Sequence, residues 1–251
     1  DHEFLRPGFT PKTFGFLEMD SPHLTQRLAD FKPDLIWLHG YGHRMCWRAL
    51  SWAKRNGAHV VYFGDSELLH ARKGLAKAVK RLLLPRFFAR CDAFLTAGDN
   101  NEAYYRHYGV DPARFYRAAC PIDVARFTVD AETREAWRAE IRARYGIASD
   151  ALVVLFSGKM QDYKRPLDLV SALRQIDDPR LHVLFIGTGP LHQEVLQAAQ
   201  AAGLAARVHV TGFVNQTEIP RLLAAGDIMA VTSERDAHPL VVSEALPFGM
   251  P

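Results

Sequence analysis

The feature that most constrains the fold is a regular alternation of short apolar runs with longer amphipathic stretches. The runs have the length and continuous apolar character of strands buried in a parallel sheet. They lie at residues 35–39, 59–63, 93–96 and 115–119 in the first half, and at 151–156, 182–186, 208–211 and 228–232 in the second. Helical patterns separate them, so the sequence predicts an α/β chain with two doubly wound, Rossmann-like parallel sheets.

Turn and cap residues mark the expected helices. Asn56-Gly57 should end a helix that begins near residue 46, and Asp99 is the expected N-cap of a helix at 100–108. We expect Pro85 to break or kink a helix that runs to about residue 90, because a proline inside a helix removes a hydrogen bond. Further helices are expected at 134–145, 167–175, 191–202 and 219–225.

These elements predict two domains that face a cleft. The first covers residues 1–123, a connecting segment with its helix covers 124–150, and the second covers 151–251. Ligands are expected where the strands end, at the carboxyl edges of the sheets. Because the chain begins at Asp1 without a methionine and ends at Pro251 where another strand is due, we expect both domains to be partial.

Composition indicates an ordinary globular protein. Hydrophobic residues make up 48% and charged residues 24%, and no apolar run reaches the ~20 residues that span a bilayer. Cys46, Cys91 and Cys120 are odd in number and widely spaced, which favours reduced thiols in a cytoplasmic protein. His39 and His43 have a ligand-like spacing but no neighbouring cysteine or carboxylate, so no metal site is predicted.

Two carboxylates near the end of the chain suggest a site for a sugar phosphate. Asp236 lies in a loop after a predicted strand, and Glu244 follows eight positions later on a helix that opens near Pro239. A helix N-terminus, here the amides of Leu240 and Val241, offers unpaired N–H groups to an anion. A carboxylate one turn further can accept hydrogen bonds from vicinal hydroxyls, so the stretch fits a nucleotide-sugar.

The loops after two earlier strands add basic and glycine residues. Gly158 is followed by Lys159 and Lys164, which can place two ammonium groups over one anion, as a departing diphosphate requires. Gly187-Thr188-Gly189-Pro190-Leu191 is a G-x-G turn, but His192 occupies the third glycine position of the dinucleotide fingerprint. The turn is therefore weak evidence for NAD.

Together these motifs resemble the family 4 retaining glycosyltransferases, which have the GT-B fold. The resemblance rests on the Asp236/Glu244 pair, the Gly158–Lys164 loop, the Gly187 turn and Thr211-Gly212-Phe213-Val214. It implies sugar transfer from a nucleotide diphosphate-sugar donor to an acceptor, with no metal and no further cofactor. Asp236, where relatives have Glu, would orient the sugar, and Glu244 would hold the ribose. Lys159 and Lys164, with Leu240 and Val241, would hold the diphosphate and act in catalysis, while Gly187 and Val214 would contact the nucleotide.

On the acceptor side the chain departs from this family. Relatives commonly carry a histidine where this chain has Gly64, so Asp65, His39 or His43 takes over the polar contact, or the acceptor site differs. Nucleotide base, sugar and acceptor stay open; the acceptor could be a glycan, a lipid-linked compound or a small molecule. Two alternatives also stay open: a non-catalytic nucleotide-sugar-binding protein, and an epimerase or phosphorylase of the same fold.

Positive charge is concentrated at residues 68–90. Seven of the residues from Arg72 to Arg90 are Lys or Arg, interleaved with leucines and phenylalanines. One interpretation is a helix with a solvated basic face and a core face. The other is a surface that binds anionic lipid on the inner face of a membrane, where a lipid-linked acceptor would lie. No nucleic-acid-binding module accompanies the charge, so no nucleic-acid partner is predicted.

Overall fold

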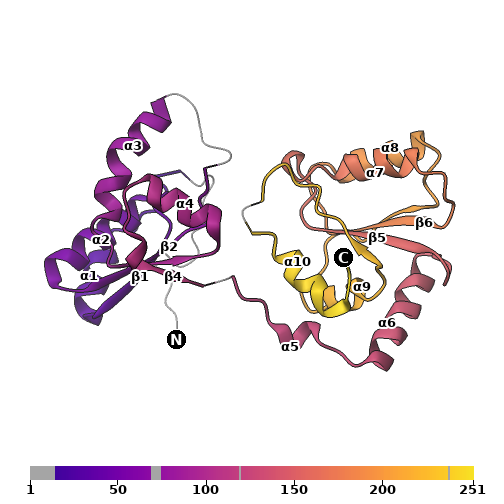
Figure 1. Ribbon diagram of the computed structural model, residues 1–251, viewed down its shortest axis with the longest axis horizontal. Coiled ribbons are helices and arrows are strands. Elements are labelled where there is room, and N and C mark those ends of the chain that lie inside the picture. The colour runs from indigo at the N-terminus through magenta and orange to yellow at the C-terminus, as the bar shows by residue number, and fades with distance from the viewer. Residues whose placement is uncertain (1–14, 69–74, 119, 237) are drawn as a thin grey trace. The chain divides into compact units, whose positions relative to one another are not determined.

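The computed structural model describes residues 15–68, 75–118, 120–236 and 238–251. The chain divides into two compact units, Asp1–Cys120 and Pro121–Pro251 (Figure 1). Each unit contains a four-stranded, wholly parallel sheet with helices between successive strands. The predicted α/β class with two Rossmann-like sheets is confirmed.

The first sheet has the strand order β1-β2-β3-β4. Its strands are β1 (Leu35–His39), β2 (His59–Phe63), β3 (Ala93–Thr96) and β4 (Phe115–Arg117). The described helices of this unit are α1 (Leu24–Phe31), α2 (Arg44–Asn56), α3 (Leu75–Phe88) and α4 (Asp99–His107). His39 pairs with Phe63, so the ends of β1 and β2 lie level at one edge of the sheet.

An aromatic cluster fills the core of this unit. The buried ring of Tyr62 on β2 contacts Phe87, Phe88, Phe94 and Tyr105, with ring centroids 5.2 to 5.8 Å apart. Edge-to-face contacts of this kind stabilise a core beyond the burial of area alone. The cluster joins α3 and α4 to the same side of the sheet.

Two local predictions for this unit, the break of a helix at Pro85 and the N-cap at Asp99, are wrong. Helix α3 is not broken at Pro85 but continues to Phe88, because full burial of Phe87 and Phe88 compensates the hydrogen bond that proline removes. Asp99 is not an N-cap: α4 begins at Asp99 itself, after Gly98. The Asp99 carboxylate instead pairs with Arg117 at 2.6 Å.

The second sheet has the order β7-β6-β5-β8. Its strands are β5 (Leu152–Ser157), β6 (Leu181–Ile186), β7 (Val208–Val210) and β8 (Ile228–Met229). The helices are α5 (Val124–Phe127), α6 (Ala131–Arg144), α7 (Pro166–Gln175), α8 (His192–Ala201), α9 (Ile219–Leu223) and α10 (Leu240–Ala245). Strand β8 is shorter than the expected 228–232, because after Ala230 donates to the carbonyl of Leu155 no further described ladder bond forms.

Separate hydrophobic clusters cover the two faces of this sheet. One contains Leu155 and Leu184 and includes Phe127, Ile141 and Phe248 from α5, α6 and the turn after α10. The other contains Phe156 and Phe185, packed under α7 and α8. Residues 124–150, expected to connect the domains, therefore contribute to the core of the second unit.

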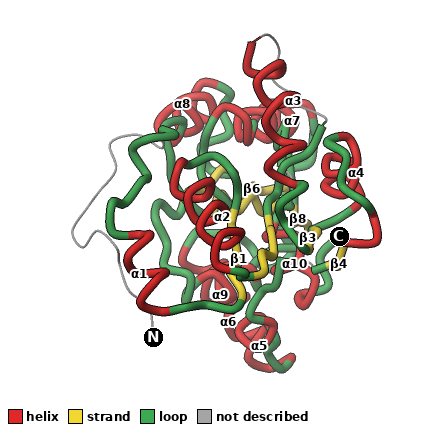
Figure 2. Tube along the Cα trace, turned by 90° about the vertical axis from the view of Figure 1, so that its left-hand side faces the viewer, coloured by secondary structure: helices red, strands yellow, loops and turns green. Residues whose placement is uncertain are grey.

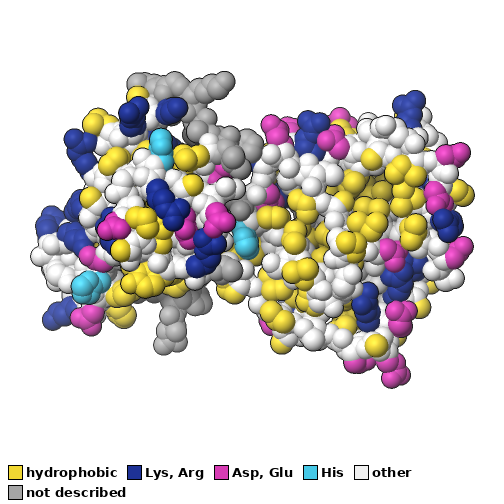
Figure 3. All heavy atoms as spheres, viewed as in Figure 1, with side chains coloured by type: hydrophobic (Ala, Val, Ile, Leu, Met, Phe, Trp, Pro, Cys, Tyr) yellow, Lys and Arg dark blue, Asp and Glu magenta, His cyan; other side chains and the backbone are white. Residues whose placement is uncertain are grey.

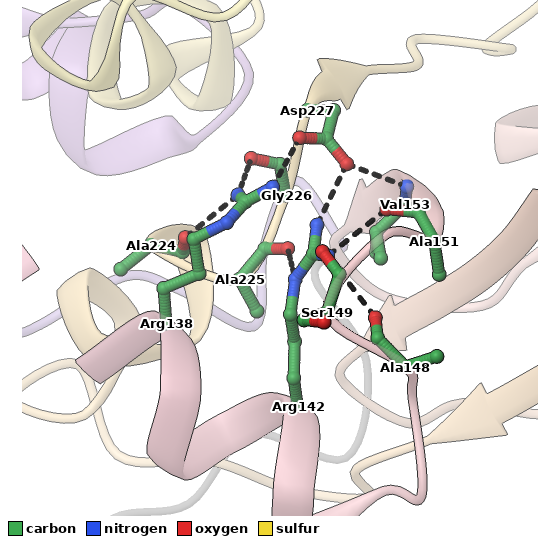
Figure 4. A network of polar contacts seen from close by, with 10 residues as sticks. All are labelled: Arg138, Arg142, Ala148, Ser149, Ala151, Val153, Ala224, Ala225, Gly226 and Asp227. Atoms are coloured by element: carbon green, nitrogen blue, oxygen red, sulfur yellow. Dashed lines mark hydrogen bonds and ion pairs between the residues drawn. The ribbon is translucent and has the colours of Figure 1, made fainter. Parts of the chain in front are cut away.

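Arg142 of α6 ties this segment to the sheet (Figure 4). Its side chain is only 4% exposed and pairs with Asp227 at 2.8 Å. The guanidinium also donates to the carbonyls of Ala151 and Ala225, at 2.9 and 3.2 Å. A buried arginine is tolerable because its donors are satisfied in this way.

Candidate functional site

The loops after β5 and β6 pack against each other with no side chain between them. A Cβ on Gly187 would lie 2.3 Å from the carbonyl oxygen of Gly158, and one on Gly189 would lie 2.4 Å from that of Met160. Met160 N–H also donates to the Thr188 carbonyl at 3.0 Å. Both glycines of the G-x-G turn are therefore required by this close backbone approach.

A pocket of about 390 Å³ opens beside these loops. Residues from the ends of β5 and β6 and from the segment after β7 line it: Ser157, Gly158, Lys159, Ile186, Gly187, Thr188, Gly189, Phe213, Val214 and Ile219. Four residues that the sequence assigned to the donor, Gly158, Lys159, Gly187 and Val214, thus share one pocket. Pockets in sheets of this type form where parallel strands end.

Phe213 is an unexpected wall of this pocket. Its side chain is 85% exposed, although a large aromatic residue normally packs inside. The sequence placed this residue in a motif but gave no signal that its ring would be exposed, since that depends on the turn at Gly212. The exposed ring offers a flat apolar surface to a ligand.

Lys164 and Asp236, 72 positions apart, form an ion pair. The Glu234 N–H donates to the Tyr163 carbonyl at 2.8 Å, and the Thr232 hydroxyl donates to the Lys164 carbonyl at 2.8 Å. The loop before α10 is therefore fastened to the short 3-10 turn Asp162–Lys164. Two residues assigned to catalysis thus contact each other directly.

The two lysines have different surroundings. Lys159 is exposed in the pocket wall and forms no ion pair with a described carboxylate. Lys164 is paired with Asp236, and its ammonium lies 5.6 Å from the ring centroid of Tyr163. One lysine is therefore available to an anion, and the other is available only if its ion pair opens.

Helix α10 presents its first amides and a half-buried carboxylate. Val242 N–H donates to the Pro239 carbonyl at 3.0 Å, whereas the N–H groups of Leu240 and Val241 have no acceptor among the described residues. Burial raises the pKa of Glu244, and the positive charge of Arg126 opposes this shift. Arg126, on α5, was not identified from the sequence, because nothing local links it to a residue 118 positions away.

The acceptor-side candidates lie at the ends of β1 and β2. His39 is the last residue of β1, and its ring centroid is 5.3 Å from that of Phe63. Asp65 is exposed two residues after β2. His43 precedes α2 without capping it, and its buried Nδ1 has no hydrogen-bond partner among the described residues. The structure brings the three to one edge of the sheet without joining them by a hydrogen bond.

Packing in the first unit explains why residue 64 is a glycine. A Cβ there would lie 2.8 Å from the Tyr62 hydroxyl, and its carbonyl accepts bonds from Asn101 and Tyr105, each at 2.8 Å. A histidine could enter only if the core residue Tyr62 moved. The place where relatives carry a histidine is thus closed by packing.

A group of hydroxyls beside this loop was missed by the sequence analysis. The Tyr41 hydroxyl lies 2.6 Å from that of Tyr104 and 3.5 Å from that of Ser66. Burial raises the pKa of Tyr41, but hydrogen bonds from Lys80, Ser66 and Tyr104 outweigh burial and bring the pKa below its usual value. The signal was weak because the contributing segments are up to 63 positions apart.

Cys46, Cys91 and Cys120 are free, and burial raises the pKa of Cys91 to about 12. Within the part of the chain that the structure describes, no three His, Cys, Asp or Glu side chains gather closely enough to hold a metal ion.

Comparison with protein families gives two matches that together span nearly the whole chain. The model described as Glycosyltransferase Family 4 matches residues 2–126, and the model described as Glycosyl transferases group 1 matches residues 138–251. The chain belongs to the family 4 glycosyltransferases. The resemblance found in the motifs is therefore confirmed, and it extends over both units.

Curated relatives support the same family. A D-inositol 3-phosphate glycosyltransferase of Xylanimonas cellulosilytica is 32% identical over an alignment 206 positions long, which covers 74% of this chain and 49% of that protein. An α-D-kanosaminyltransferase of Streptomyces kanamyceticus is 30% identical over 124 residues, which are 49% of this chain and 32% of that protein. The chain thus spans about half the length of the first relative.

Solved structures agree on the fold. The protein HepE of Anabaena, solved in complex with UDP, has a TM-score of 0.74 at 19% identity, over 94% of this chain and 64% of that chain. The sucrose-phosphate synthase of Thermosynechococcus elongatus has a TM-score of 0.70 at 18% identity, over 90% and 57%. These similarities confirm the predicted GT-B fold.

Proposed function

We propose that this family 4 glycosyltransferase chain transfers a sugar from a nucleotide diphosphate-sugar to an acceptor, with retention of anomeric configuration and without a metal ion. The observation that carries the proposal is the pocket at the ends of β5 and β6, where Gly158, Lys159, Gly187 and Val214 come together. Gly187 and Gly189 leave no space for a Cβ between the two loops, so these loops contribute backbone and the Lys159 ammonium group to a pocket that the exposed ring of Phe213 also lines.

Glu244 is proposed to hold the ribose. Its half-buried carboxylate accepts no hydrogen bond from a described residue, and burial already raises its pKa. Vicinal hydroxyls would supply the missing donors, and a hydrogen bond to a charged group contributes about 1.5–3 kcal/mol. Val214 would contact the base through its backbone.

Diphosphate binding is proposed to open the Lys164–Asp236 ion pair. The diphosphate would compete with Asp236 for the Lys164 ammonium, while Lys159 and the amides of Leu240 and Val241 complete its binding. Asp236, released from Lys164, would then orient the transferred sugar. The two lysines would stabilise charge that grows on the leaving diphosphate, which is the task a metal ion performs elsewhere.

The acceptor is proposed to bind at the edge of the first sheet that carries His39, His43 and Asp65. These side chains follow strand ends, where ligands bind in sheets of this type. A glycan, a lipid-linked compound or a small molecule fits this proposal. Free, largely buried cysteines support a reducing, cytoplasmic location.

Thermal unfolding with UDP, GDP and ADP, followed by titration with the nucleotide that stabilises, tests the donor site. Glu244→Ala should weaken binding at least about tenfold, the loss expected for one charge-assisted hydrogen bond. Glu194→Ala, an exposed carboxylate on α8, is the matched control and should bind normally. Equal affinity of the Glu244 variant and the unmodified chain would remove Glu244 from the site.

Product analysis separates transfer from the alternatives. Incubation with the matching nucleotide-sugar and an acceptor panel should give an α- or β-product with the donor's own anomeric configuration. Lys159→Ala and Lys164→Ala should lower kcat more than they raise KM for the donor, because the leaving charge grows in the transition state. Tight binding without any product would identify a binding protein, and an altered free sugar-nucleotide would identify an epimerase.

A further inference from the structure

Hydroxyl groups from three elements meet at the carboxyl edge of the first sheet. Tyr41 lies on the loop after β1, Ser66 lies on the loop after β2, and Tyr104 lies on α4. The Tyr41 hydroxyl oxygen is 2.6 Å from that of Tyr104 and 3.5 Å from that of Ser66. Tyr104 is only 3% exposed, whereas Tyr41 and Ser66 are half-buried. Tyr104 therefore supports the group from the core, and Tyr41 lies nearer the surface.

Hydrogen bonds to the backbone hold both loops in place. The indole N–H of Trp47 donates to the Tyr41 carbonyl at 3.0 Å. The buried amide of Asn101 donates to the carbonyls of Gly64 and Ser66, at 2.8 and 2.9 Å. A side chain on a loop fixed in this way loses little freedom when it binds a ligand, which is what a positioning residue requires.

Helix α3 brings a cation to the ring of Tyr41. Lys80 lies one turn before the buried Leu84, on the face of the helix that packs on the core, and its ammonium is 5.3 Å from the Tyr41 ring centroid. The first turns of α3 extend beyond the other described helices of the unit (Figure 2), and Lys or Arg side chains lie on the surface over it (Figure 3). Neither α3 nor any other described helix is long and apolar enough to cross a membrane. The Tyr41 hydroxyl thus lies beside a positive charge.

The proton of the Tyr41 hydroxyl has no close acceptor among the described residues. Burial and the contact with Tyr41 raise the pKa of Tyr104, so Tyr104 keeps its proton and donates to the Tyr41 oxygen. The Lys80 ammonium donates to the same oxygen. A phenol oxygen that accepts two hydrogen bonds still has its own proton to donate. The Ser66 hydroxyl, at 3.5 Å, is beyond the usual O–H···O range of about 2.5–3.0 Å.

The candidates that the sequence offered at this edge are less well held. The His39 ring packs against Phe63, the buried Nδ1 of His43 has no partner, and Asp65 is exposed. Within the described residues, no hydrogen bond orients any of these three side chains. Each would lose more rotamer freedom than Tyr41 on fixing a ligand.

We propose that Tyr41 positions the acceptor, in place of the histidine that relatives carry at Gly64. Its hydroxyl donates a hydrogen bond to a hydroxyl oxygen of the acceptor that neighbours the attacking one, so the acceptor is a sugar or another polyol. Lys80 and Tyr104 strengthen this donor, because each donates to the Tyr41 oxygen. The inference rests on the proposed sugar transfer and deepens it on the acceptor side.

Transfer to deoxygenated acceptors tests the contact. At saturating donor, kcat/KM is measured for a panel of monosaccharides and polyols, each beside its monodeoxy analogues. With the unmodified chain, one analogue of the accepted compound should be about tenfold poorer, the loss of one strong hydrogen bond. Tyr41→Phe should lower kcat/KM for the parent compound about tenfold and treat parent and analogue alike, since the two changes remove the same bond. Tyr116→Phe, which removes the hydroxyl of an exposed tyrosine on β4, is the matched control and should keep the discrimination.

The pH dependence supplies a second readout. Burial raises the pKa of Tyr41, but Lys80, Ser66 and Tyr104 outweigh it and hold the pKa below the usual value of about 10. The hydroxyl donates only while protonated, so kcat/KM for the acceptor should fall as the pH rises through this pKa. The other titratable groups packed around Tyr41 are buried phenols whose pKa values burial raises: Tyr62, Tyr104 and Tyr105.

Two lysine variants on α3 separate this alkaline fall from other effects of pH. Lys80→Met should move the fall to higher pH, because the cation that lowers the Tyr41 pKa is gone. Lys77→Met, at an exposed position of the same helix, should leave it in place. Tyr41→Phe should have no fall below pH 10.

Circular dichroism and nucleotide titration check that each variant keeps its fold and its donor site. Discrimination retained in Tyr41→Phe, or an alkaline fall unmoved in both Tyr41→Phe and Lys80→Met, would overturn this inference and leave the proposed function standing. Absence of product from the unmodified chain with the whole panel would overturn both. Should Tyr41→Phe fail to fold, Lys80→Met, whose side chain is half-buried, decides through the alkaline fall alone.

Discussion

The two units contain the same arrangement, called a joint below: an aspartate just before one strand binds the neighbouring strand and a cation. The cation differs between the two units. Asp92 precedes β3 and Asp227 precedes β8, and each exchanges two hydrogen bonds with the second residue of the neighbouring strand. In the first unit these bonds join Asp92 to Val60 at 2.7 and 2.8 Å. In the second they join Asp227 to Val153 at 2.8 and 2.9 Å. The aspartate thus extends the ladder by one step beyond the strand.

The cations differ in burial and in what else they bind. Lys54 of α2 holds Asp92 and is 31% exposed, so its other donors can reach water. Arg142, at 4% exposed, holds Asp227 together with Arg138 and also binds four backbone carbonyls. Burial would raise the pKa of either aspartate, but in each case these cations and the strand amide outweigh it and lower the pKa.

The difference shows how residues 124–150 become part of the second unit. A lysine can join one helix to one carboxylate. An arginine has five donors, so one side chain on α6 connects the ends of two strands and the turn after α9 at once. Breaking the two joints should therefore have unequal effects.

Asp227→Ala should have the largest effect. It leaves the buried Arg142 unpaired and removes the acceptor of Val153 N–H, so we expect a loss of about 3–5 kcal/mol in the free energy of unfolding. Urea unfolding followed by hydrogen exchange with mass spectrometry reports each unit separately. Exchange should rise in the second unit and stay unchanged in the first. A uniform rise in both units would show that they do not unfold independently.

Lowering the pH should also destabilise mainly the second unit. His182 and His209 share a hydrogen bond of 3.0 Å between rings on β6 and β7, and burial lowers the pKa of His209 to about 4. An unfolded histidine has a pKa near 6.5, so between these values only the unfolded chain binds the proton. Stability is therefore full above pH 6.5 and falls as the pH drops toward 4.

Protonation of this histidine pair should lower the free energy of unfolding by about 2 kcal/mol, once the partial exposure of the rings is allowed for. Comparing urea unfolding at pH 7 and pH 4.5 measures it. His209→Gln cannot titrate and should remove most of this pH dependence. The charged groups around the pair, Arg207 and Arg142, stay positive throughout and add to the cost of protonating His182. An unchanged pH profile in the variant would contradict the assignment.

Strand positions were the part of the fold that local sequence could predict. Runs such as 35–39 and 59–63 are mostly apolar, and both form strands of a parallel sheet as predicted. The predicted burial of 35–39 is wrong: in β1 only Leu38 is buried, and Leu35 and Trp37 are 53% and 62% exposed. The errors have distant causes. Asp99 binds Arg117 rather than capping its own helix, and α3 survives Pro85 because its last residues are buried by other elements.

The candidate site also has a part that local sequence predicts and a part that depends on distant residues. The glycine turn and the loop lysine were visible as motifs, and the structure places Gly187 and Lys159 in one pocket. The Lys164–Asp236 ion pair, the position of Arg126 near Glu244 and the Tyr41–Tyr104 hydroxyl contact join residues at least 60 positions apart. Without covariation between positions, a single sequence carries no sign of such contacts.

Asp92→Ala should have a smaller effect than Asp227→Ala. Val60 N–H loses its acceptor, but Lys54 can be solvated, so we expect a loss of about 1–2 kcal/mol. The same unfolding measurement, read in the first unit, gives the value. A loss equal to that of Asp227→Ala would mean that burial of the cation does not set the strength of the joint.

The smallest effect should come from replacing Lys54 while Asp92 remains. In Lys54→Met the Asp92 carboxylate keeps its bond from Val60 N–H and is 39% exposed, so the lost ion pair should cost only about 0.5 kcal/mol. Arg142→Met is the matched change in the second unit, and there four carbonyls as well as Asp227 lose their donor. We expect urea midpoints of the first unit to shift barely in Lys54→Met, and those of the second to shift severalfold more in Arg142→Met. Equal shifts would show that the strand amide, and not the cation, carries both joints.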